Sequence, residues 1–138
     1  MIMYLQNVIA NKKLFVIAFA CLSNLAVSSD LNSWDCYKLE GAKIIAEDGT
    51  YLGKIEDDYD SDSIYNEYSE YGNSYNSDSI WNEYSEYGNE YSSKSALNDS
   101  ASEPPVLLKD GEVIGKLTTK EYVYDGYDVN EIKETCDW

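Results

Sequence analysis

The hydrophobic positions of this chain form three patterns. A largely apolar stretch runs from Leu14 to Val27 near the N-terminus. Two shorter segments, residues 43–55 and 106–117, each consist of two apolar runs around a central Asp-Gly pair. Between these segments, single tyrosines and isoleucines recur in a polar background. The three patterns predict a leader, two β-hairpins and an intervening series of turns.

Each of the two short apolar segments predicts an antiparallel hairpin. Asp48-Gly49 and Asp110-Gly111 lie between the two apolar runs of residues 43–55 and 106–117, respectively. An Asp-Gly pair in this position is a strong hairpin signal, because the tight turn requires residues that tolerate positive φ. Glu103-Pro104-Pro105 marks the return to the second hairpin, since proline favours extended backbone and ends the preceding structure.

A tandem repeat of 16 residues occupies the middle of the chain. Residues 59–74 (YDSDSIYNEYSEYGNS) and 75–90 (YNSDSIWNEYSEYGNE) are identical at 13 of 16 positions. A third, decayed copy begins at Tyr91, so the repeat region spans residues 59–99. Such near-identity indicates that each copy is one structural unit that stacks or pairs with the next. The abundance of Tyr, Ser, Asn, Asp and Gly favours turns over long helices or strands.

The order of hairpin and repeats resembles a set of small bacterial secreted or envelope-associated proteins, in which a DGxxLGxL hairpin precedes copies of YxxDSIxNPYGxYGSxY. The matching stretches are DGTYLGKI, the two 16-residue copies and DGEVIGKL, within residues 43–127. Each copy departs from that pattern at three positions. Glu67 and Glu83 stand where the pattern has proline, Ser69 and Ser85 where it has glycine, and Glu70 and Glu86 where it often has arginine. The resemblance implies a secreted module and supplies no catalytic residue.

The N-terminal segment predicts export. Two lysines at 12–13 precede the apolar run, as is typical of a secretory signal peptide covering residues 1–28. The run has 14 residues, fewer than the roughly 20 that a spanning helix needs, so a permanent membrane span is the weaker alternative. Lipid attachment at Cys21 is another alternative, although the preceding residues match a lipobox poorly. Residues 29–138 are thus predicted to form a single secreted domain, periplasmic or extracellular.

Two cysteines remain after the leader, Cys36 and Cys136, near the two ends of the domain. In an oxidising compartment they permit one intramolecular disulfide; free thiols and an intermolecular bridge are the alternatives. The closed loop would contribute about 4 to 5 kcal/mol through chain entropy. The predicted fold is therefore a mainly β, small irregular repeat domain, with two Asp-Gly hairpins flanking tyrosine-rich turn repeats and a disulfide joining the ends.

The charge balance excludes several classes of function. The 138 residues include 26 Asp plus Glu, 10 Lys and no Arg or His, which gives a formal charge of −16, and −18 after removal of the leader. A surface this acidic repels phosphate, so nucleic acid is excluded as a partner. Without histidine, there is no Ser-His or Cys-His couple for catalysis. We therefore expect a protein that is not an enzyme.

A hydrolase remains as a distant alternative, because carboxylate pairs can cleave glycosides. The nominal pairs, Glu67 with Glu83 and Glu70 with Glu86, recur at the repeat period. Catalytic carboxylates need two different environments, which copies of one unit do not obviously provide.

The aromatic residues of the repeats have a structural and a functional interpretation. In the first, Ile64 and Ile80, with Tyr65 and Trp81, fill the interior. In the second, an exposed surface of tyrosine and acid binds a cationic protein or peptide, or a neutral glycan, through Tyr68, Tyr71, Trp81, Tyr84 and Tyr87. Residues 56–90 contain 11 acids and no lysine, which favours a cationic or neutral partner.

A Ca²⁺-dependent binding module is the second functional hypothesis, and otherwise no cofactor is expected. Asp58, Asp60 and Asp62 alternate as at the start of an EF-hand loop. The motif then fails, because Ser63 stands where glycine is required and Ser69 where a bidentate glutamate belongs.

Overall fold

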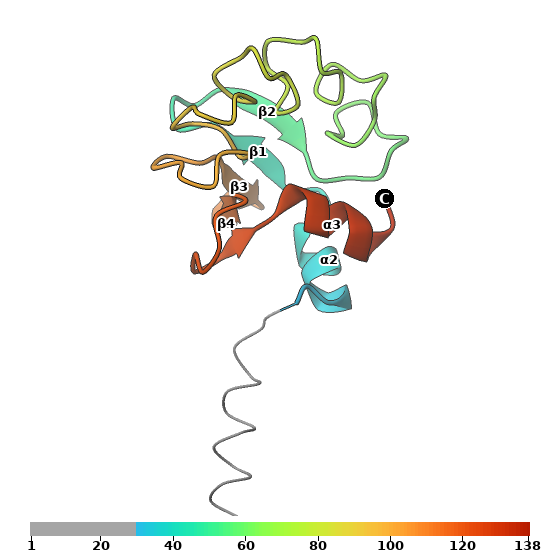
Figure 1. Ribbon diagram of the computed structural model, residues 1–138. Helices are drawn as coiled ribbons and strands as arrows, with labels where there is room; N and C mark the ends of the chain where they lie inside the picture. Colours follow the sequence, from blue (N-terminus) through green and yellow to red (C-terminus); the bar gives the residue numbers. More distant parts are fainter. Residues whose placement is uncertain (1–29) are drawn as a thin grey trace, which may run out of the picture. The chain divides into compact units, whose positions relative to one another are not determined.

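The computed structural model describes residues 30–138, and the predicted signal peptide with Cys21 lies outside them. Leu31–Trp138 form one compact unit with a five-stranded sheet (Figure 1). The elements in chain order are α2 (Ser33–Leu39), β1 (Lys43–Ile45), β2 (Tyr51–Lys54), β3 (Val106–Lys109), β4 (Glu112–Leu117), β5 (Gly126–Tyr127) and α3 (Val129–Cys136). None of the helices in the described part of the chain has both the length and the apolar character to cross a membrane.

The sheet joins the two short apolar segments of the sequence. Its strand order is β2-β1-β3-β4-β5, with antiparallel pairs throughout except for the parallel pair of β4 and β5. The central contact is between β1 and β3, where Ile44 lies opposite Leu107. Asp110 and Gly111, between β3 and β4, have φ angles of 52° and 81°, as a type I′ turn requires. The mainly β prediction is confirmed at this level.

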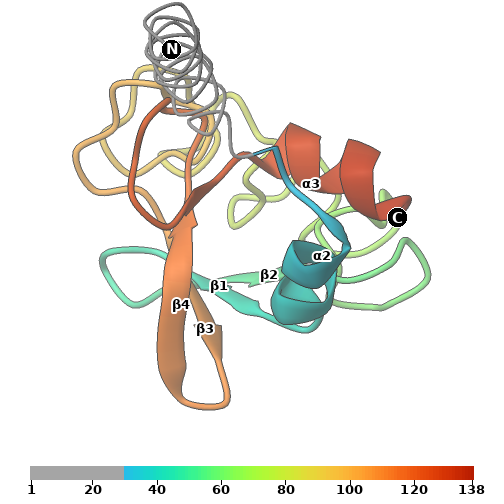
Figure 2. The same cartoon turned by 90° about the horizontal axis from the view of Figure 1, so that it is seen from below.

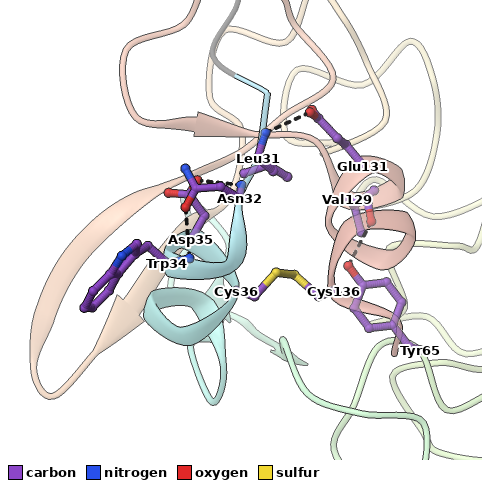
Figure 3. Close-up of a disulfide and its surroundings, with 9 residues drawn as sticks. All are labelled: Leu31, Asn32, Trp34, Asp35, Cys36, Tyr65, Val129, Glu131 and Cys136. Atoms are coloured by element: carbon purple, nitrogen blue, oxygen red, sulfur yellow. Dashed lines mark hydrogen bonds between the residues drawn. A yellow bond between two sulfur atoms is a disulfide. The ribbon is translucent and has the colours of Figure 1, made fainter.

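Two short helices, which the sequence analysis did not predict, lie side by side (Figure 2). Asn32 and Asp35 form a capping box at the start of α2, and Asp128 caps α3 by accepting from backbone N–H groups. The predicted disulfide joins the two helices: the Cys36 and Cys136 sulfurs are 2.07 Å apart and their Cα atoms 5.5 Å apart (Figure 3). Helices of 7 and 8 residues are marginal in isolation, so this link and their packing sustain them.

The segment between the two hairpins is a continuous series of turns. Successive turns mostly begin three residues apart. At each such step, the backbone N–H of the residue that starts one turn donates to the carbonyl of the residue that starts the turn before it, and the series runs from residue 57 to residue 101. Each copy has four such steps and one four-residue step, which accounts for the period of 16. The residues that start the turns are Asp57, Asp60, Ser63, Asn66 and Ser69, then Asn73, Asn76, Ser79, Asn82 and Ser85, then Asn89, Ser92, Ser95 and Asn98.

Side chains reinforce the turn series. Most of the turn-starting Asp, Asn and Ser side chains accept a hydrogen bond from the backbone N–H two residues later. At the four-residue steps, a Cβ on Gly72 or Gly88 would overlap the carbonyl of Asn66 or Asn82. The third copy keeps the turn series as far as Ala101, although its sequence identity decays earlier.

The turn series packs its isoleucines into the core. Ile64 is 1% exposed, and Ile80 and Ala96, at the equivalent positions of the later copies, are 0% exposed. They share one hydrophobic cluster with strand residues such as Leu52 and Leu107. The series also joins the edge of the sheet, because the backbone of Lys54 in β2 forms an isolated parallel β-bridge with Ser63. The interior role that the sequence suggested for the repeat isoleucines is therefore seen in the fold.

Candidate functional site

Five tyrosines of the turn series project into solvent. We call Tyr59, Tyr68, Tyr75, Tyr84 and Tyr91 the tyrosine array; their side chains are between 85% and 92% exposed. Each lies two residues after an Asp or Asn that starts a turn, and its backbone N–H donates to that side chain at 2.8 to 3.0 Å. The outward position of these rings is therefore set by hydrogen-bonded turns rather than by a mobile loop.

Aromatic residues that follow a serine turn instead face inward. Tyr65, two residues after Ser63, is 6% exposed, and its hydroxyl donates to the carbonyl of Val129 at 2.8 Å (Figure 3). Burial raises the pKa of Tyr65. Within the turn series the pattern Asp/Asn-x-Tyr accompanies an exposed ring, and Ser-x-aromatic accompanies a buried or half-buried one.

The structure divides the five residues predicted for binding. Tyr68 and Tyr84 belong to the exposed array. Tyr71 packs edge to face on Tyr51 with ring centroids 5.0 Å apart, and Tyr87 is 7% exposed. Trp81 is half-buried. The five are therefore not brought together on one face, and sequence reasoning missed Tyr59, Tyr75 and Tyr91, which the Asp/Asn-x-Tyr pattern would have found.

Trp81 nevertheless contributes to a concave site. An open hollow of about 600 Å³ between the second and third copies, which we call the aromatic hollow, is lined by Trp81, Glu83, Tyr84, Gly88, Asn89, Glu90, Tyr91 and Leu97. A second hollow of about 690 Å³ adjoins it and shares Glu90, Tyr91 and Leu97. The aromatic hollow thus combines three aromatic side chains with two carboxylates.

The carboxylates of the aromatic hollow have no cationic partner among residues 30–138. Ion pairs in this range join Lys54 to Asp60, and Lys94 to both Asp48 and Glu86. Lys94 is the sole lysine of the turn series, so Glu83 and Glu90 remain uncompensated. The adjacent carboxylates of Glu83 and Glu90 raise the pKa of Tyr84 and of Tyr91, respectively.

Two of the three predicted calcium ligands are engaged by other groups. Lys54 Nζ lies 2.8 Å from Asp60 Oδ2 and lowers the pKa of Asp60. The Tyr51 hydroxyl donates to Asp62 Oδ2 at 3.0 Å, whereas Asp58 is exposed. In the described part of the chain, no three His, Cys, Asp or Glu side chains are grouped to hold a metal ion.

Comparison with known proteins adds no family assignment. The chain matches no protein-family model, no curated protein and no solved structure. The resemblance to the DGxxLGxL proteins therefore stays a prediction.

Proposed function

We propose that the protein is an exported, non-enzymatic interaction module that presents the tyrosine array and its flanking carboxylates to a cationic partner. The observation that carries this proposal is the near-complete exposure of five tyrosines, each held by the same turn geometry. Tyrosine provides a large, amphipathic contact area at low entropic cost, because only two side-chain angles become ordered on binding. Large exposed rings on a hydrogen-bonded backbone are suited to contact with a partner.

The charge of the repeats supports a cationic partner over an anionic one. Residues 56–90 contain 11 acids and no lysine, so they attract positive charge and repel phosphate. Such an interaction is expected to weaken as salt screens it. A neutral glycan would instead bind the rings with little dependence on salt.

Export is supported by the link between α2 and α3. The disulfide of Cys36 and Cys136 is of a kind that persists in oxidising compartments. The basic and apolar pattern of residues 1–28 favours the same location.

The proposal is tested by binding of the oxidised protein to immobilised oligolysine, oligoglutamate and a neutral oligosaccharide at low and high salt. A variant with serine at all five positions of the tyrosine array should lose most of its oligolysine binding. The matched control is Y122S/Y124S, because Tyr122 and Tyr124 are 93% and 90% exposed but lie outside the repeats. Equal loss in both variants, or no salt-sensitive binding of oligolysine by the wild type, would contradict the proposal.

A further inference from the structure

The two near-identical copies of the repeat differ at three positions. Asp60, Tyr65 and Ser74 of the first copy become Asn76, Trp81 and Glu90 in the second. Asp60 is explained by its ion pair with Lys54. Trp81 and Glu90 both line the aromatic hollow. Two of the three residues that distinguish the second copy therefore line one concave site.

The change from Tyr65 to Trp81 alters the role of the side chain. Tyr65 is 6% exposed, packs near Trp138 and is bonded to Val129, so it serves the core. Trp81 is half-buried, and its indole N–H donates to the carbonyl of Ile64 at 2.6 Å. This hydrogen bond to the first copy holds the indole in place while the ring contributes to the wall of the hollow.

The change from Ser74 to Glu90 adds a carboxylate beside an exposed ring. Glu90 lines the hollow next to Tyr91, as Glu83 does next to Tyr84. Aromatic faces attract cations, most strongly the face of tryptophan, and a nearby carboxylate strengthens the attraction. A concave surface with indole, phenol and uncompensated carboxylate groups matches the cationic head of a basic side chain better than a neutral sugar.

We infer that the aromatic hollow binds the cationic head of a lysine or arginine side chain from a partner protein, with Trp81, Tyr84 and Tyr91 around the head and Glu83 and Glu90 balancing its charge. This inference rests on the proposed function, since it names the site and the ligand chemistry of the cationic partner. The flexible alkyl stem of such a side chain can lie along Leu97, which lines the same hollow.

The test is a titration of the isotope-labelled, oxidised protein with the capped tripeptide acetyl-Gly-Lys-Gly-amide, followed by the three indole N–H signals. The Trp81 signal should shift with saturation, while that of Trp34, which is 78% exposed, should not. The corresponding tripeptide with arginine in place of lysine should shift the Trp81 signal in the same way. The norleucine tripeptide, which keeps the stem and lacks the charge, should leave the Trp81 signal unmoved.

The sharpest controls are variants in which a residue of the second copy is replaced by the residue at the equivalent position of the first copy. W81Y and E90S should each weaken lysine-peptide binding by about three- to tenfold. The double variant E90S/S74E keeps the net charge and moves the carboxylate to the first copy, and it should bind as weakly as E90S. Y84A should weaken binding, whereas Y68A, at the equivalent exposed position outside the hollow, should not.

The outcomes separate this inference from the proposed function. If the wild type binds oligolysine but the Trp81 signal does not move and E90S/S74E keeps full affinity, the hollow is not the site and only net charge matters. A Trp81 shift caused by the norleucine peptide or by a neutral oligosaccharide, at equal concentration, would overturn the assignment of a cation. If the wild-type protein does not bind oligolysine, both this inference and the proposed function are overturned.

Discussion

The Tyr87 hydroxyl lies 2.8 Å from Asp48 Oδ2 and 3.0 Å from Thr50 Oγ1, which ties the second repeat copy to the loop between β1 and β2. Lys94 of the third copy reaches the same carboxylate at 3.3 Å. One repeat earlier, Tyr71 packs on Tyr51 of β2. The tyrosines that face inward at the repeat period therefore attach the turn series to the first hairpin.

Removal of the Tyr87 hydroxyl should destabilise the fold. Y87F leaves Asp48 with fewer hydrogen bonds in a part-buried contact, so we expect the free energy of unfolding to fall by about 1 kcal/mol. Denaturant titration measures the change. Y84F is the matched control, because the Tyr84 ring is 89% exposed, and it should have no measurable effect. Equal stability of Y87F and the wild type would show that the contact contributes nothing.

The Asp48 cluster should make stability depend on pH in the acid range. Hydrogen bonds from Thr50, Tyr87 and Lys94 hold the pKa of Asp48 well below its ordinary value. A carboxyl whose pKa is lowered in the folded state stabilises the fold fully above its unfolded-state pKa of about 4. This contribution is lost progressively as the pH falls from there toward the folded-state pKa. D48N should be less stable than the wild type at pH 7, and the difference should shrink on acidification. A difference that stays constant through the acid range would contradict this linkage.

Alkaline pH should destabilise the protein through Tyr65. Burial, with a smaller effect of Asp128, raises the pKa of this phenol, so the folded state favours its neutral form. The corresponding stabilisation is complete below the unfolded pKa of about 10 and is lost as the pH rises further. Y65F cannot ionise, so its stability should fall less steeply above that pH. Unfolding followed against pH, with Y68F as the exposed control, checks the slope.

Reduction of the disulfide should lower the thermal midpoint. The bridge spans a sequence separation of 100 residues, for which the chain-entropy model predicts about 4.7 kcal/mol. C36S/C136S should match the reduced wild type and show no further response to reductant. A midpoint that reductant leaves unchanged in the wild type would argue against the bridge as a stabilising link.

The two terminal helices show why part of the fold was not predicted. Asn32, Asp35 and Asp128 are recognisable capping residues, but segments of 7 and 8 residues carry too weak a periodicity to identify as helices. Their stability comes from packing and from a disulfide whose halves lie 100 residues apart. The cysteine pairing was predictable because only two cysteines follow the predicted leader, whereas the helices that position them were not.

The candidate site, like the fold, was only partly predictable from the sequence. The repeat period and the turn-forming residues were readable because turns are local, and the acidity was readable because it is a count of charges. Sequence reasoning grouped Tyr71 and Tyr87 with Tyr68 and Tyr84, since all four recur at the same period. It did not separate rings that contact β2 and its loop from rings that face water.

By itself, the sequence determined the 16-residue period, the positions of the apolar segments and the single possible cysteine pair after the predicted leader, because each depends on nearby residues or on a count. The tertiary structure alone decided which tyrosines are exposed and that Trp81, Tyr84 and Tyr91 border one hollow. The physical reason is that each turn can form locally, but its inward and outward sides are defined only when the series packs on a sheet built from both ends of the domain.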